Sequence, residues 1–201
     1  HWTTQNLDRL RYNLALGIRI AFFIIFPICV WLFIYKIPLV YILLEKGNFD
    51  RVATHAVATA LGCYTGVFLG VGIASITGRG YFAIQNTFIP AVIMAASFLF
   101  YVLIAIPLSR LFSYSGLALA LSLTILIGLA VDLFMLRRLL KGIEGRVIIG
   151  TINKVIIASA VMGCAALASG QILALSNLTE NKFFFSLKVG LSSLVSFIIY
   201  A

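Results

Sequence analysis

Long apolar runs separated by short polar connections organise the chain. Each run is close to the roughly 20 residues that a helix needs to cross the hydrocarbon core of a bilayer. The runs are continuous rather than alternating, which predicts membrane-spanning helices and not the strands of a barrel. The six runs are Leu14 to Tyr35, Ala53 to Thr77, Phe88 to Leu108, Gly116 to Leu136, Val147 to Leu175 and Phe183 to Ala201.

Prolines and glycines predict where these helices bend and where they pack. Pro27 lies inside the first run and removes a backbone hydrogen bond, so we expect a kink there. The short apolar piece Ile37 to Leu44 either continues this helix past a kink at Pro38 or lies in the membrane interface. In the second run, glycines every four residues form one face that packs within the subunit or against a second copy. These glycines are Gly62, Gly66 and Gly70.

Composition agrees with this pattern. Of 201 residues, 62% are hydrophobic and 10% are charged, whereas soluble domains are roughly 45–50% apolar and about 25% charged. The expected fold is therefore an all-α, polytopic membrane helix bundle. The three cysteines all lie in apolar runs, where we expect small hydrophobic side chains rather than disulfides or metal ligands. With only two histidines, at positions 1 and 55, neither a metal site nor an enzyme is expected.

The net charge of +9 is distributed unevenly between alternate connections. One side carries seven basic residues, namely Arg9, Arg11, Arg79, Arg137, Arg138, Lys141 and Arg146. The other side carries five, namely Lys36, Lys46, Arg51, Arg110 and Lys182. The positive-inside tendency then places both ends of this segment in the cytoplasm. Because the chain begins at His1, we expect it to be a piece of a longer membrane protein.

A polar break interrupts the apolar pattern between Thr77 and Pro90. It contains Arg79, two glycines, two neighbouring aromatic residues and three consecutive polar side chains. Such a composition predicts a cytoplasmic connection that acts as a hinge. Pro90 is expected at the first position of the following helix, where a missing backbone N–H costs nothing.

A few charged residues lie inside the runs, where charge is costly and suggests function. Arg19 and Lys154 either extend toward the headgroups or hold an anionic group at the cytoplasmic mouth of a cavity. Lys188 has a similar depth in the last run. Asp132 is the only acid within a run, and it is either solvated near the interface or couples a cation.

At the polar break the sequence resembles a known family. Residues Gly78 to Pro90 resemble the cytoplasmic connection between the tenth and eleventh transmembrane helices of the MurJ (MviN) lipid II flippases. Three further segments agree in order and spacing with the ninth helix, the stretch after it and the thirteenth helix. They are Leu16 to Ile20 with Pro27, Leu43 to Phe49, and Lys154 with Met162.

The resemblance implies the fold of the multidrug/oligosaccharidyl-lipid/polysaccharide exporter superfamily. The six runs would be helices nine to fourteen of a fourteen-helix flippase. Residues 1–142 would belong to the C-lobe, and residues 143–201 would form two additional helices that line a lipid-tail groove. The partners would be the missing N-terminal helices, membrane lipids and the substrate, with no cofactor and no nucleic acid.

The implied function is alternating access that flips lipid II, the lipid-linked peptidoglycan precursor, across the bacterial cytoplasmic membrane. In this segment Arg19, Arg79 and Lys154 would be the substrate-binding residues, near the cytoplasmic mouth. The family's essential cavity arginines lie in its first, second and eighth helices, outside this chain. Some relatives have an Asn and Asp pair for sodium in the helix that corresponds to the third run. In this chain Ser97 and Tyr101 are the only polar side chains of that run before Ser109, so no metal site is expected. The loop triplet Gln85 to Thr87 also lacks the common acid.

Two other functions remain open at this point. One is a flippase for another lipid-linked oligosaccharide, or a drug exporter, of the same superfamily. The other is a membrane scaffold that transports nothing.

Overall fold

The structure, a computed structural model, describes residues 4–44, 50–140, 142 and 145–175. These residues form the helices α1 (Thr4–Ile34), α2 (Lys36–Leu44), α3 (Arg51–Ala83), α4 (Phe88–Leu139) and α5 (Gly145–Leu175), with no strand among them. By length and composition, four of the helices in this part of the chain could cross a membrane. The predicted helical membrane bundle is thereby confirmed. The last predicted run, from Phe183, lies outside the described residues.

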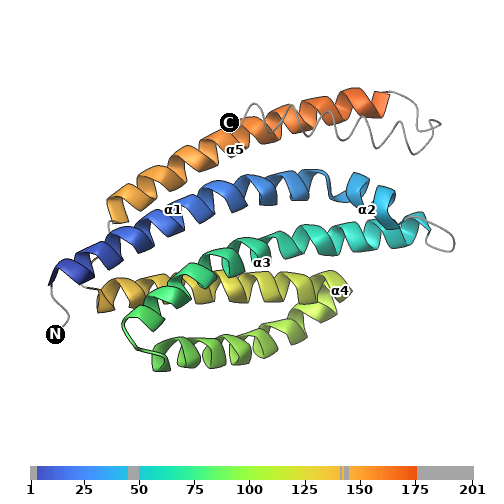
Figure 1. Cartoon of the computed structure of the whole chain (residues 1–201). Helices are drawn as coiled ribbons and strands as arrows, with labels where there is room; N and C mark the ends of the chain where they lie inside the picture. The colour runs from blue at the N-terminus through green and yellow to red at the C-terminus, as the bar shows by residue number, and fades with distance from the viewer. Residues whose placement is uncertain (1–3, 45–49, 141, 143–144, 176–201) are drawn as a thin grey trace.

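Helix α4 is too long to be one straight crossing. Its 52 residues would extend about 78 Å at 1.5 Å per residue, against a hydrocarbon core of about 30 Å. Ser113, with φ 51° and ψ −130°, is non-helical, and the chain turns back there (Figure 1). The third and fourth predicted runs fall on the two resulting segments. We call residues 88–112 the first segment of α4 and residues 114–139 its second segment.

The short apolar piece after the first run is a separate helix. α2 spans nine residues and begins directly after a bend at Tyr35. Hydrogen bonds of 2.9 Å on each side of the bend, from Tyr35 to Trp31 and from Leu39 to Tyr35, hold the two helices together. The bend therefore precedes Pro38, which lies in the first turn of α2, where a backbone N–H has no partner within the helix. Pro27 is buried within α1, which continues through it.

Helix α3 corrects the prediction for the polar break. The helix continues to Ala83, so the first half of the expected loop is helical and only residues 84–87 connect α3 to α4. Packing explains the difference, because Tyr81 is fully buried and a β-carbon on Gly80 would lie 3.0 Å from Leu14. Pro90 is the third residue of α4 and not its first. It still lies within the first turn, where a backbone N–H has no helical partner.

The core lies where α1, α3 and the second segment of α4 meet. α3 contacts α1, α2 and α4, and α5 packs along α1. One buried cluster joins the beginning of α1 to the ends of α3 and α4. Its members are Leu14, Ala15, Tyr81, Leu136 and Leu140. A second cluster, deeper in the bundle, adds a residue of α5 and consists of Ile18, Phe22, Ile73, Leu129 and Val155.

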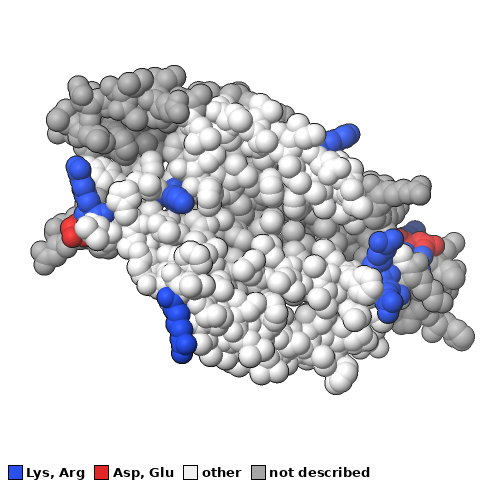
Figure 2. Space-filling model, turned by 180° about the vertical axis from the view of Figure 1, so that it is seen from behind, with Lys and Arg blue, Asp and Glu red and all other residues white. Residues whose placement is uncertain are grey.

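The outer surface is apolar between two charged ends. On the face drawn in Figure 2, most lysine, arginine and acidic side chains lie toward the ends of the helices. Large exposed side chains such as Phe98 and Leu103 on the first segment of α4 occupy the region between the ends. Soluble monomers rarely expose apolar patches larger than a few hundred Å². This surface is therefore suited to lipid acyl chains.

Candidate functional site

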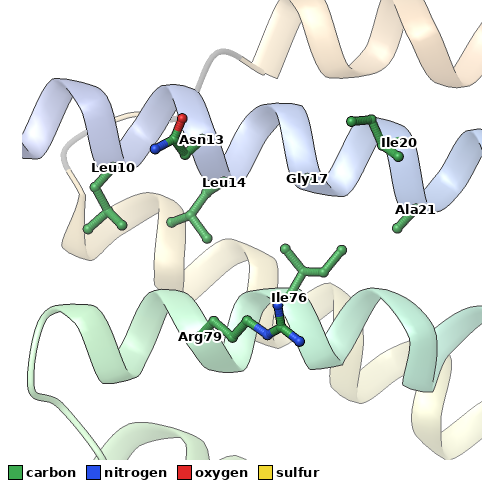
Figure 3. Close-up of a pocket in the computed structure, with 8 residues that line it drawn as sticks. All are labelled: Leu10, Asn13, Leu14, Gly17, Ile20, Ala21, Ile76 and Arg79. Atoms are coloured by element: carbon green, nitrogen blue, oxygen red, sulfur yellow. The ribbon is translucent and has the colours of Figure 1, made fainter.

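A pocket of about 450 Å³ opens between α1 and α3 near the end of the bundle where α1 begins. Gly17 lies in its wall, and a β-carbon there would come within 3.1 Å of Ile76 on α3, so the glycine keeps the two helices close. The lining is mostly aliphatic, and Leu14 and Ile76 point toward each other across it (Figure 3). The remaining lining residues are Leu10, Asn13, Ile20, Ala21 and Arg79.

Arg79 is the charged residue of this pocket. It is exposed, projects from the last two turns of α3 and extends beside Ile76 (Figure 3). Asn13, also exposed, is the other polar side chain in the lining. Among the described residues, the one ion pair joins Asp8 to Arg11 at 2.7 Å, so no carboxylate in that part of the chain neutralises Arg79. An aliphatic pocket with one guanidinium is suited to an amphipathic anion.

The other two predicted substrate-binding residues lie at the contact between α1 and α5. Arg19 is half-buried, and its Nε donates a hydrogen bond of 2.9 Å to Oγ1 of Thr151. Lys154 lies one turn further along α5 and is exposed. Arg19 therefore links two helices that are far apart in the sequence, while Lys154 faces outward. The structure does not bring either residue into the pocket that Arg79 lines.

A buried polar contact that the sequence analysis did not predict surrounds Asp132. The carboxyl group of Asp132, on the second segment of α4, accepts a hydrogen bond from the Thr77 hydroxyl of α3. One turn further along α3, the Tyr81 hydroxyl donates to the backbone carbonyl of Asp132 at 3.0 Å. The sequence offered one signal for this site, an acid inside an apolar run. It offered no means of finding the partners, because Thr77 and Tyr81 belong to the stretch expected to be a loop.

The glycine face of α3 lies against other parts of the same chain. Side chains at Gly66 and Gly70 would meet Ser122 and Ile125 of the second segment of α4. At Gly62 a side chain would meet the Lys36 side chain, 3.0 Å away. Nearby, the Ser122 hydroxyl donates to the backbone carbonyl of Cys63. Within the described residues, this glycine face of α3 therefore packs against other helices of the same subunit.

Metal-binding groups do not gather in the described part of the chain. No set of three or more His, Cys, Asp or Glu side chains there could hold a metal ion. The three cysteines, including the exposed Cys164, are free thiols. Three polar features of the described helices bear on function: Arg79 at its pocket, the Arg19–Thr151 contact and the buried Asp132 contact.

Long apolar helices with polar contacts enclosed between them define a polytopic, helical membrane protein. The family model of the lipid II flippase MurJ matches residues 1–192, and the chain belongs to this family. The family is one of transporters rather than enzymes. Comparison with curated proteins gave no match.

A solved structure supports the fold. "Lipid II flippase MurJ, inward closed conformation" is similar over 98% of this chain, with a TM-score of 0.76 and 24% sequence identity. This chain spans 40% of the length of that protein's chain. The likeness therefore covers nearly all of the present helices and less than half of the solved flippase.

Proposed function

We propose that the chain is the C-terminal part of a transporter that flips lipid II from the inner to the outer leaflet of the bacterial cytoplasmic membrane. The family match over residues 1–192 carries this proposal. In this assignment the six apolar runs are helices nine to fourteen. Residues 1–142 belong to the C-lobe, and residues 143–201 supply two further helices that accompany the lipid tail. The remaining helices of the cavity come from the rest of the protein.

Orientation follows from the positions of the basic residues. The start of α1, the end of α3 and the end of α4 lie at the same end of the bundle (Figure 1). That end carries Arg9, Arg11, Arg79, Arg137 and Arg138, and positive charge favours the cytoplasmic side. We therefore assign this end, with both ends of the segment, to the cytoplasm.

The substrate explains why a guanidinium at this end is useful. A pyrophosphate and its sugars cannot cross hydrocarbon unaided, because transferring unpaired polar and charged groups out of water is very costly. Arg79 binds the pyrophosphate by charge-assisted hydrogen bonds as the substrate enters from the inner leaflet. The aliphatic pocket beside it accommodates the first part of the lipid chain. Arg19 and Lys154 provide further positive charge along α1 and α5.

Reconstitution of the full-length protein into liposomes tests this function. Protein containing this chain is expected to move lipid II across the bilayer, whereas purified residues 1–201 are expected to give no translocation above empty liposomes. Arg79→Ala should lower the rate roughly tenfold or more, the effect of losing a hydrogen bond to a charged group. Arg110→Ala is the matched control, because Arg110 is also exposed but lies three residues before Ser113. The turn of α4 at Ser113 is at the end of the bundle away from the end of α3 that carries Arg79 (Figure 1).

Three outcomes would count against the proposal. Full-length protein that is folded and inserted but inactive would exclude lipid II as the substrate. Clear translocation by residues 1–201 alone would show that the rest of the cavity is not required. Equal losses for Arg79→Ala and Arg110→Ala would remove the assigned role of Arg79.

A further inference from the structure

The buried contact around Asp132 has no role in the function proposed above. Asp132 is on the second segment of α4, and Thr77 and Tyr81 are one turn apart on α3. Their exposed fractions are 9%, 0% and 0%, so the contact is closed to the surroundings. Three polar side chains from two helices therefore meet at one enclosed point.

Two kinds of hydrogen bond operate at this point. Tyr81 donates to the backbone carbonyl of Asp132, and its hydroxyl also lies close enough to the Asp132 carboxyl group to interact with it. The Thr77 hydroxyl has a single hydrogen and two acceptors within reach, the Ala74 carbonyl of its own helix at 3.0 Å and the Asp132 carboxyl group. If α3 and α4 separate, Thr77 can turn fully to Ala74 and remain satisfied. The Asp132 carboxyl group then loses its partners on α3 and needs water.

A carboxyl group is a costly means of packing two helices together. Acids within membrane spans are expensive, and those that occur usually serve a function. Well-packed hydrophobic residues often stabilise a protein as well as buried charged groups do. Asp132 also has no ion-pair partner among the described residues, where the one ion pair joins Asp8 to Arg11. The nearest arginines on the same helix, Arg137 and Arg138, are exposed at its end. Static packing therefore gives no reason for an acid at this position.

We propose that Asp132 is a positioning residue for transport. Its carboxyl group latches α3 to the second segment of α4 in the arrangement described, and it releases Thr77 when these helices separate during the transport cycle. The proposal rests on the proposed function, because α3 also carries Arg79. Arg79 is two residues from Thr77, so the latch sets the position of the guanidinium relative to the pocket between α1 and α3.

Distances between α3 and α4 test the latch without reference to transport. Spin labels at Ser75 and Ala130, which are both exposed, are introduced into full-length protein lacking its native cysteines and studied in lipid nanodiscs. One closed distance should dominate in this parent and in Thr77→Ser, which keeps the hydroxyl. Thr77→Val and Asp132→Leu should shift the ratio of open to closed populations roughly tenfold toward the open form. If Asp132→Leu fails to fold, the nearly isosteric Thr77→Val carries the test.

Transport measurements then separate a positioning role from a structural one. Thr77→Val should lower the rate of lipid II translocation per folded molecule roughly tenfold, and Thr77→Ser should restore it. A purely structural role would reduce the amount of folded protein and leave both the rate per molecule and the distance ratio unchanged. That result would overturn the latch and leave the proposed function standing. If the distances shift as expected but the parent moves no lipid II, the proposed function fails and the latch stands as a conformational contact.

Discussion

Replacing Gly116 with alanine is expected to disrupt the turn that folds α4 back on itself. A β-carbon at this position would overlap the backbone carbonyl of Leu108 and would lie 2.9 Å from the backbone nitrogen of Ser109. Backbone atoms cannot rotate away as the end of a side chain can, so the two segments of α4 must separate. We expect a destabilisation of about 3 kcal/mol or more, the upper end of the cost of overpacking.

Thermal unfolding of the full-length protein in detergent measures this effect. The temperature at which half of the protein leaves the monodisperse fraction should fall clearly for Gly116→Ala. Gly150→Ala is the control, because Gly150 is also helical but a β-carbon there would meet nothing within 4 Å. Alanine should stabilise that position by about 1 kcal/mol through its helix propensity. An unchanged midpoint for Gly116→Ala would show that Gly116 does not lie in close contact with the backbone of Leu108 and Ser109.

Gly70→Ala is expected to weaken the packing of α3 on α4 far more than Gly72→Ala does. A β-carbon at Gly70 would overlap Cγ2 of Ile125, which branches directly from the β-carbon and moves only if the side chain changes rotamer or the helices part. A β-carbon at Gly72 would overlap Cδ1 of Ile25, the end of a side chain that can rotate aside. We expect Gly70→Ala to cost about 1–3 kcal/mol and Gly72→Ala to be nearly neutral.

The same unfolding measurement compares the two variants directly. Both variants place the same substitution on α3 with a similar initial overlap. A difference between their unfolding midpoints therefore reports how easily the overlapped atom, Cγ2 of Ile125 or Cδ1 of Ile25, can move away. A loss for Gly72→Ala as large as that for Gly70→Ala would contradict this explanation. It would indicate that the contacts of α3 with α1 and with α4 tolerate an added methyl group equally poorly.

The membrane helices could be predicted from the sequence because hydrocarbon imposes a length and a polarity on every crossing. α5 begins at Gly145, two residues from the predicted start at Val147, and both end at Leu175. The turn of α4 at Ser113 likewise falls between two predicted runs. Such boundaries depend on local composition, which a single sequence displays.

The end of α3 could not be predicted, because tertiary contacts override local composition there. Glycine and polar residues between Thr77 and Ala83 are typical of a loop, yet Tyr81 is buried and Gly80 permits close contact with Leu14. The partners of Asp132 and Arg19 could not be predicted for a related reason. Thr77 is 55 residues from Asp132, and Arg19 is 132 residues from Thr151. No pattern within one run indicates which distant helix will lie beside it.

The central claim is that this chain forms part of a protein that flips lipid II, and genetic complementation tests it most directly. Bacteria depleted of their own MurJ are supplied with the full-length protein that contains residues 1–201, with its level in the membrane measured in parallel. We predict that growth and cell shape are restored, and that residues 1–201 alone restore neither. Lysis of the depleted cells, despite membrane-inserted full-length protein at a normal level, would contradict the claim.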